Sequence, residues 1–309
     1  MIGALIIDKP KGLTSHDVVG RIRRAARTRR VGHAGTLDPF ATGVLVCCIG
    51  RATRLVQFLV GLDKEYIATV RLGYGTDTQD GTGQQITPLR SSKELSLEGV
   101  RSALDQFIGP QLQTPPMFSA KKIGGERLYR AAREGREIVR EPASIVVHTL
   151  KLVEDEGAIL NVNADGTCDF RVHVRCSSGT YVRTLAHDLG ERLGPGGHLI
   201  ELRRTEVGHF RIADALTLEE VEEMTADGLN KALISTSEML AQLPVVILDD
   251  QQERAVVNGR GFVLSDDEAG VGLGSCVRLC DPDGRLVAVG KSDPGNFLKP
   301  YVVIGVEDV

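Results

Sequence analysis

The sequence has no tryptophan, and aromatic residues make up only 4% of its 309 residues. No apolar run approaches the length of about 20 residues that a membrane-spanning helix needs, so no membrane association is expected. Residues 1–7 are apolar but are followed by Asp8 and Lys9 too early for a signal peptide, which predicts a buried first strand in a cytoplasmic protein. With 42% hydrophobic and 25% charged residues, the composition is typical of a globular chain with one large domain or two.

Cysteine and histidine are too scattered to indicate a metal or redox site. The six cysteines contain no Cys-x-x-Cys pair, and the seven histidines contain no His-x-x-x-His spacing. Cys47 and Cys48 fall in the apolar stretch 43–50, where free cysteine behaves as a small buried hydrophobic residue. The phosphate-binding Gly-Lys-Ser/Thr loop, the dinucleotide fingerprint and the Gly-x-Ser-x-Gly motif are absent as well. We therefore expect buried thiols, no metal and no cofactor.

The charge is unevenly distributed along the chain. In total, 37 Lys and Arg residues against 41 Asp and Glu residues give a net charge of −4, which by itself argues against a nucleic-acid partner. Residues 1–60, however, hold 10 basic and 3 acidic residues, whereas residues 212–309 hold 7 basic and 18 acidic ones. Segments 111–140 and 171–211 are also basic. The arginines between residues 21 and 30 fit either the solvated face of a helix or a surface that neutralises phosphates.

Hydrophobic periodicity predicts a mixed α/β (α+β) fold followed by a small all-β unit. Alternating apolar residues predict strands at 66–72 and 170–176, and helical spacing predicts helices after Thr14 or Ser15, at 97–108 and at 181–193. Residues 216–243 are acidic and helical in pattern. From about residue 245, short β-rich runs alternate with turn signals such as Asp281-Pro-Asp-Gly284. This change of pattern places a domain boundary near residue 244.

The loop of residues 31–45 contains the densest set of residues that could perform chemistry. It combines three glycines with His33 and Asp38, and Pro39 disfavours a helical conformation at Asp38. Asp38 fits either a cap of a following helix or a nucleophilic carboxylate, which would need a cation to hold it ionised. Arg183, Arg203 and Arg204 are the candidates for that cation. Tyr66 and Tyr181 could stack on a base.

At these residues the sequence closely resembles the TruB family of tRNA pseudouridine-55 synthases. The resemblance is carried by ordered blocks that cover most of residues 1–210. They are Asp8-Lys-Pro-Lys-Gly12, Gly32-His-Ala-Gly-Thr-Leu-Asp-Pro39, Asp63-Lys-Glu-Tyr66, Gly75-Thr-Asp-Thr-Gln-Asp80, Pro115-Pro-Met-Phe-Ser-Ala-Lys121, Gly125-Glu-Arg-Leu-Tyr-Arg-Ala-Ala-Arg133, Cys176-Ser-Ser-Gly-Thr-Tyr-Val-Arg183 and Leu202-Arg-Arg204. The tail from about residue 245 resembles the small β-barrel PUA domain, which binds RNA in other proteins.

The resemblance implies a mixed-sheet pseudouridine synthase domain over residues 1–243, with a thumb-like insertion at about 115–142, and a PUA-like domain over 245–309. It implies a monomeric enzyme that isomerises the T-loop uridine of tRNA without cofactor or metal and holds the T-arm stem-loop. Asp38 would be the nucleophile, Arg183 its ion-pair partner, and Tyr66 would stack on the flipped base and take part in proton transfer. The other residues implied at the RNA interface are Lys9, Pro10, His33, Lys121, Arg133, Tyr181, Leu202 and Arg203.

Two alternatives remain open at this stage. The first is a non-catalytic protein that binds or folds tRNA with the same basic surface, in which case Asp38 would be dispensable. The second is a guide-dependent synthase of the dyskerin type, against which the thumb-like block argues. The acidic tail predicts that residues 212–309 support the catalytic domain more than they bind phosphates.

Overall fold

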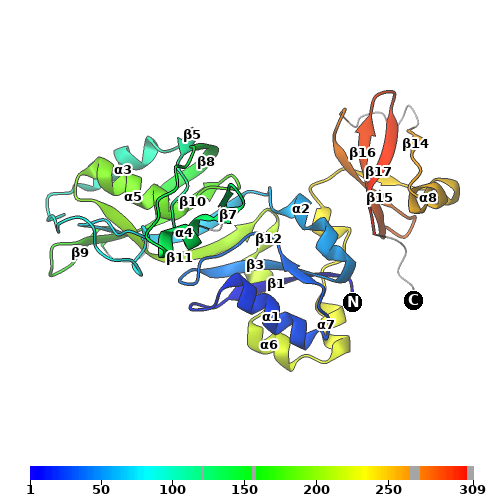
Figure 1. The fold of residues 1–309 in the computed structure, drawn as a ribbon, viewed down its shortest axis with the longest axis horizontal. Helices are drawn as coiled ribbons and strands as arrows, with labels where there is room; N and C mark the ends of the chain where they lie inside the picture. Colours follow the sequence, from blue (N-terminus) through cyan, green and yellow to red (C-terminus); the bar gives the residue numbers. More distant parts are fainter. Residues whose placement is uncertain (120, 155–157, 265–271, 305–309) are drawn as a thin grey trace.

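A computed structural model describes residues 1–119, 121–154, 158–264 and 272–304. Its main feature is a ten-stranded mixed sheet whose central order is β1-β3-β11-β4-β10-β8-β5. The strands on this path are β1 (Gly3–Lys9), β3 (Thr42–Ile49), β4 (Lys64–Leu72), β5 (Gly109–Gln113), β8 (Ala143–Leu152), β10 (Cys168–Cys176) and β11 (Gly197–Val207). Short strands β2 (Val31–His33), β9 (Asn161–Val162) and β12 (Phe210–Arg211) pair with β3, β10 and β11. Figure 1 shows the sheet extending through the main body of the molecule.

Helices cover the two halves of the sheet separately. Helices α3 (Leu97–Asp105) and α5 (Val182–Leu193) pack on the apolar side chains of β4, β8, β10 and β11. Helices α1 (Ser15–Ala25), α6 (Leu218–Glu223) and α7 (Ala226–Ala232) pack on β1 and β3. The alternation along β4, where every second side chain is buried, explains why one face of this strand joins the core.

The two halves of the sheet meet where β3 and β11 run parallel. The pairing is short, with Arg203 opposite Thr42 and Arg204 opposite Gly43. At Gly43 the backbone has a φ of +103°, and a Cβ there would lie 2.1 Å from the carbonyl oxygen of Arg204. Only glycine therefore allows β11 to approach β3 this closely. The loop that carries Asp38 lies directly before this junction, so the junction positions the site.

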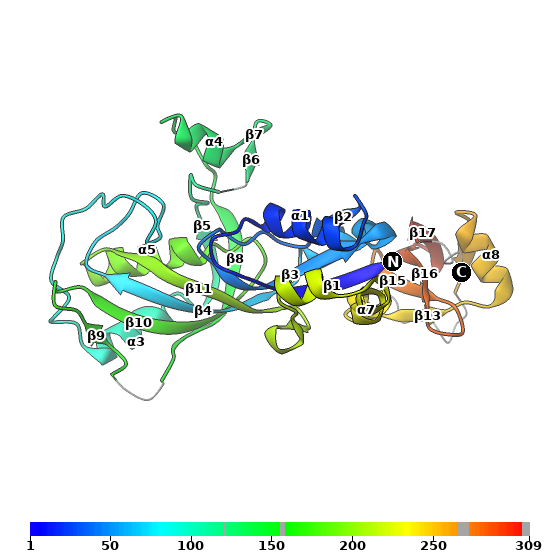
Figure 2. The same ribbon diagram turned by 90° about the horizontal axis from the view of Figure 1, so that it is seen from below.

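The thumb-like insertion projects away from the sheet. It contains β6 (Lys122–Ile123), β7 (Glu126–Arg127) and α4 (Leu128–Arg133), and it connects β5 to β8. Figure 2 shows these elements standing clear of the main body, on the same side of the sheet as α1.

The C-terminal unit is a curled five-stranded half-barrel in the order β13-β15-β16-β17-β14. Its strands are β13 (Val245–Ile247), β14 (Phe262–Val263), β15 (Cys276–Cys280), β16 (Leu286–Asp293) and β17 (Phe297–Val303), and it also contains α8 (Asp250–Val257). Asp249 starts α8 with a capping box, a helix that the sequence analysis did not predict. The half-barrel shares a core cluster with the 3-10 helix η1 (Gly50–Leu55) and with α2 (Val56–Leu59), which agrees with a supporting role.

Most predicted elements are present with small shifts at their ends. Thr14, rather than Ser15, caps α1, and α3 ends at Asp105, three residues earlier than predicted. The predicted last β-run, 302–306, agrees with β17 only at residues 302 and 303: Ile304 follows the end of the strand, and residues 305 and 306 lie outside the described residues. Five of the six cysteines are buried and Cys276 is half-buried; all six are free thiols.

Candidate active site

A cavity of about 260 Å³ lies at the junction of the two half-sheets. This volume is slightly below the about 300–1,000 Å³ that drug-sized ligands occupy, which suits a smaller group such as one nucleobase. The cavity is lined from several elements by Gly35, Thr36, Leu37, Asp38, Val60, Lys64, Tyr66, Ser119, Ser177, Gly179, Thr180, Tyr181, Val182, Arg183, Leu202 and Arg204.

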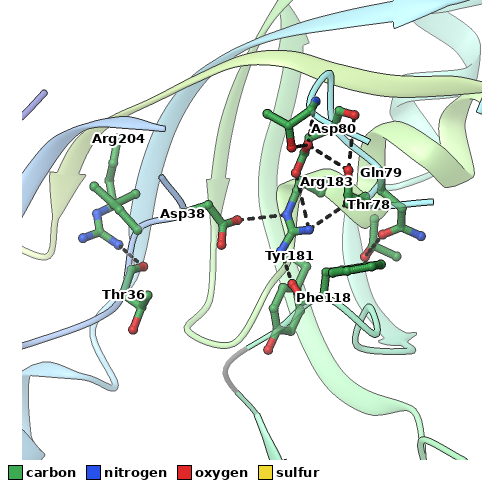
Figure 3. Close-up of polar contacts among 12 residues, drawn as sticks. Thr36, Asp38, Thr78, Gln79, Asp80, Phe118, Tyr181, Arg183 and Arg204 are labelled. Carbon is green, nitrogen blue, oxygen red and sulfur yellow. Dashed lines mark hydrogen bonds and ion pairs between the residues drawn. The ribbon is translucent and has the colours of Figure 1, made fainter. Parts of the chain in front are cut away.

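Asp38 and Arg183 form an ion pair in this cavity. Nε of Arg183 lies 2.9 Å from Oδ2 of Asp38 (Figure 3). The Arg183 side chain is only 4% exposed, whereas that of Asp38 is 35% exposed, so a ligand can reach the carboxylate but not the guanidinium. Oδ1 of Asp38 has no hydrogen-bond partner within the described ranges. The pair therefore offers one aimed and accessible carboxylate oxygen. The alternative in which Asp38 caps a helix is wrong, because the next element is β3.

The remaining nitrogens of Arg183 hold two further segments. Nη1 donates to the carbonyl oxygen of Thr78 at 2.7 Å and lies 3.6 Å from Oδ2 of Asp80. Nη2 donates to the carbonyl oxygen of Phe118 at 2.8 Å. Figure 3 shows these interactions converging on one guanidinium. The planar guanidinium of Arg183 has donors in fixed directions, so its bonds to Thr78 and Phe118 also fix the direction in which Nε points at Asp38.

Asp80 is itself fixed by its own loop. Its Oδ1 accepts hydrogen bonds from Thr78 Oγ1 at 2.8 Å and from the backbone N–H of Thr82 at 2.9 Å. Between them, Gln79 adopts a left-handed φ of 62°, and its side-chain oxygen accepts a hydrogen bond from Thr184 Oγ1. The loop thus presents both a carbonyl and a carboxylate to Arg183.

Opposing effects set the ionisation of Asp38. Burial raises the pKa of Asp38 above its ordinary value, the Arg183 cation lowers it, and the nearby Asp80 carboxylate raises it. Burial is the largest of these effects, so the raised pKa is the net direction. Burial also raises the pKa of Tyr66, which keeps its phenol neutral.

Three buried cations support the loops around the cavity, and none of them forms an ion pair with a carboxylate among the described residues. Arg204 is 1% exposed and donates to the carbonyl oxygens of Gly35, Thr36 and Val44. Lys64 donates to the carbonyls of residues 60 and 62, and Lys9 to those of residues 10, 13 and 39. Burial lowers the pKa of each lysine to about 8. These side chains hold the backbone around Asp38 and add positive potential beside it.

The predicted residues Tyr66, Tyr181 and Leu202 all line the cavity. Tyr66 lies on β4 opposite Arg204, and its side chain is 8% exposed. Tyr181 immediately precedes α5, and its backbone N–H and C=O bind the buried side chain of Gln113 at 2.8 and 3.1 Å.

Other predicted residues lie outside the cavity lining. Arg203 projects from β11 on the other side from Leu202 and Arg204 and pairs with Asp8, so it faces away from the cavity. Lys9 is fully buried and occupied by loop carbonyls, and Pro10 supplies one of them. His33 lies half-buried on β2, with its pKa lowered by burial, and Lys121 and Arg133 are exposed on the thumb-like insertion.

Sequence reasoning missed Asp80, Gln113, Lys64 and the carbonyl of Phe118 as parts of the site. All four lie in or next to the blocks that carry the family resemblance, but a backbone carbonyl leaves no residue signature. Among the described residues, no group of three or more His, Cys, Asp or Glu side chains could hold a metal ion. In the same part of the chain, no helix has the length and apolar character to cross a membrane.

Comparison with known proteins decides the family. Residues 23–182 match the model of the TruB family pseudouridylate synthase N-terminal domain, and residues 183–242 match that of the tRNA pseudouridylate synthase B C-terminal domain. The chain belongs to the TruB family. The second match ends just before β13, the first strand of the half-barrel.

Curated relatives cover the chain closely. The tRNA pseudouridine synthase B of Solibacter usitatus is 41% identical over 305 residues, 98% of this chain and 100% of that protein. That of Opitutus terrae is 48% identical over 232 residues, 75% of this chain and 92% of the relative.

Two solved structures share the fold over nearly the whole chain. A chain of an H/ACA RNP bound to a substrate RNA containing 2′-deoxyuridine aligns with a TM-score of 0.71 and 25% identity, over 99% of this chain and 86% of that one. A chain of an archaeal box H/ACA sRNP Nop10-Cbf5 complex aligns with a TM-score of 0.69 and 26% identity, over 99% of this chain and 87% of that one.

Proposed function

We propose that this protein isomerises the T-loop uridine of tRNA to pseudouridine, with Asp38 as the nucleophile. The observation that carries the proposal is the accessible Asp38 carboxylate held 2.9 Å from a buried arginine in a cavity of nucleobase size. The full-length relatives named tRNA pseudouridine synthase B support tRNA as the substrate. The Solibacter usitatus relative is 41% identical and is matched over its whole length, whereas the two H/ACA chains are 25% and 26% identical and are matched over 86% and 87% of theirs. This difference favours the stand-alone enzyme over a guide-dependent one.

The geometry suits a reaction that detaches and reattaches a base. A uridine inside folded RNA must leave its stack before a side chain can reach it, and stacking in the pocket offsets the cost. Tyr66 and Leu202 supply apolar walls for the flipped uracil. Asp38 attacks C1′ or C6, or stabilises a cationic sugar, while the N1–C1′ bond breaks. After rotation, C5 bonds to C1′, C5 loses its hydrogen and N1 gains one.

A cavity closed by the RNA prevents the loss of the detached uracil to water. The thumb-like insertion, with Lys121 and Arg133 exposed on it, starts beside Ser119 of the cavity lining and is suited to hold the T-arm stem. The enzyme in this proposal acts as a monomer.

Release of tritium from tRNA transcribed with 5-tritiated uridine tests the proposal, because the C5 hydrogen is lost only when the new bond forms. We expect release by the wild-type protein and none by Asp38→Asn, while the exposed-site control Asp105→Asn keeps wild-type activity. Replacing the T-loop target uridine with cytidine should also abolish release. Undiminished release by Asp38→Asn would show that Asp38 is not the nucleophile, and tRNA binding without any release by the wild type would favour the non-catalytic alternative.

A further inference from the structure

The turn between α1 and β2 carries three exposed arginine side chains. Six arginines lie between residues 21 and 30. Arg21 forms a bidentate pair with Glu222 on α6, Arg23 donates to the carbonyl of Val31, and Arg24 is exposed in the last turn of α1. Arg27, Arg29 and Arg30, which we call the basic turn, are exposed. Within the part of the chain that the structure describes, their guanidinium groups have no hydrogen-bond or ion-pair partner.

Arg27 occupies a position where its own conformation is unfavourable. It follows the last turn of α1 with a φ of 48°, a left-handed geometry in which helices usually place glycine or asparagine. The negative end of the α1 dipole favours a cation there, but this effect fades within the last helical turn and does not reach Arg29 and Arg30. A cluster of three arginines that includes a strained position is therefore better explained by a ligand than by stability.

The basic turn lies well away from the cavity. Val31, which follows the turn, pairs with Ile49 at one end of β3. Gly43, at the other end, pairs with the cavity residue Arg204. Six residues of strand at about 3.3 Å each separate the two ends by about 20 Å. Figure 2 shows α1 and the thumb-like insertion on the same side of the sheet, so an RNA held at the cavity can continue over this end of α1.

We propose that the basic turn binds the ribose-phosphate backbone of the tRNA outside the hairpin that carries the target uridine. Arginine is suited to this role because its planar donors match phosphate oxygens in pairs. A hairpin that fills the cavity and reaches the thumb-like insertion need not pass the turn, whereas a full-length tRNA continues beyond the hairpin. The inference rests on the proposed function, because it takes tRNA as the substrate.

Binding of two RNAs by one variant tests the inference. The variant is Arg27→Gly, Arg29→Gln and Arg30→Gln, and the matched control removes three exposed arginines of the half-barrel, Arg254→Gln, Arg260→Gln and Arg285→Gln. Both are made in the Asp38→Asn protein so that the RNA is not converted. We expect the Kd for full-length tRNA to rise about 10-fold in the basic-turn variant and less than 2-fold in the control. The slope of log K against log salt should fall by about 2 to 3, near one for each phosphate that the variant no longer neutralises.

The isolated T-arm hairpin separates this inference from general RNA binding. Its Kd should change less than 2-fold in the basic-turn variant, and with Asp38 restored the variant should convert the hairpin at the wild-type rate. An equal loss for both RNAs, or no loss for full-length tRNA, would overturn the inference. If the wild type converts neither RNA, the proposed function fails, while the binding comparison still reports on the turn. Arg27→Gly alone should not lower the unfolding temperature, because glycine suits the left-handed position.

Discussion

A guanidinium nitrogen of Arg183 and the backbone carbonyl oxygen of Phe118 lie 2.8 Å apart, at the root of the thumb-like insertion. The same side chain pairs with Asp38 through Nε and holds the loop of Thr78 and Asp80 through Nη1. One buried cation therefore connects the Asp38 carboxylate to the base of the thumb-like insertion. Because Arg183 binds both groups, a displacement of the Phe118 carbonyl would change the distance between Arg183 and Asp38.

Replacing Arg183 with lysine should reduce the single-turnover rate of tritium release by about 100-fold or more. An ammonium keeps the charge but cannot reach Asp38, Thr78 and Phe118 together, so the carboxylate loses its fixed orientation toward the substrate. Binding of tRNA should change far less than the rate, which separate rate and Kd measurements would show. Arg192→Lys, at the exposed end of α5, is the matched control. A rate within 3-fold of wild type for Arg183→Lys would mean that charge alone suffices.

Gln113 should contribute to the rate although it does not line the cavity. Its side chain binds both backbone groups of Tyr181 at the start of α5, two residues before Arg183, and it ends β5 where the thumb-like insertion begins. Gln113→Ala leaves the Tyr181 N–H without its partner, whereas the Tyr181 C=O still accepts the Leu185 N–H at 3.1 Å. The unpaired N–H should cost about 1–3 kcal/mol in unfolding free energy. We expect the single-turnover rate to fall about 10-fold with an unchanged Kd for tRNA.

Gln113→Glu is the control for this interaction, because a carboxylate still accepts the Tyr181 N–H bond at the positive end of the helix. It should recover much of the rate that Gln113→Ala loses. Denaturant unfolding and rate measurements on both variants separate the two effects. A loss of stability in Gln113→Ala without any loss of rate would limit Gln113 to a structural role.

Part of this site could be predicted from the sequence and part could not. Asp38, Tyr66 and Arg183 lie in sequence blocks with recognisable chemistry, and all three line the cavity. Arg203 and Arg204 are adjacent in sequence, and their side chains point to opposite faces of β11. Only the register of that strand decides which of them faces the cavity. The hydrogen bond to Phe118 uses a carbonyl that every residue type possesses, so it depends on the tertiary fold alone. The half-barrel strands could be predicted from short β-rich runs between turn signals, whereas α8 is too short for a helical spacing of apolar residues to be recognised.

Gly43→Ala should strongly destabilise the fold. The new Cβ would lie 2.1 Å from the Arg204 carbonyl oxygen, and the φ of +103° is strained for any side chain. Relief requires β3 and β11 to separate, which breaks the junction beneath the cavity. We expect a loss of unfolding free energy of about 3 kcal/mol or more, measured by denaturant unfolding. Gly12→Ala has a similar positive φ but open space around its Cβ, so it should lose much less. Equal stability of the two variants would contradict the close approach.

The rate of tritium release should fall on the acid side with a midpoint above 3.8, the ordinary value for aspartate, because the pKa of Asp38 is raised by burial. The active carboxylate form gains population as pH rises through this folded-state pKa. The same shift has a cost in stability: between the ordinary and the raised pKa the folded state binds the proton more tightly, so the fold loses stability as pH rises through that window.

Asp38→Asn removes this cost and should unfold at pH 7 at the same temperature as the wild type or a higher one. Circular dichroism at each pH would check that the acid limb does not reflect unfolding. A limb centred below 3.8 would mean that the Arg183 cation outweighs burial at Asp38. An Asp38→Asn protein that unfolds several degrees lower would lead to the same conclusion, because the ion pair would then be a net source of stability.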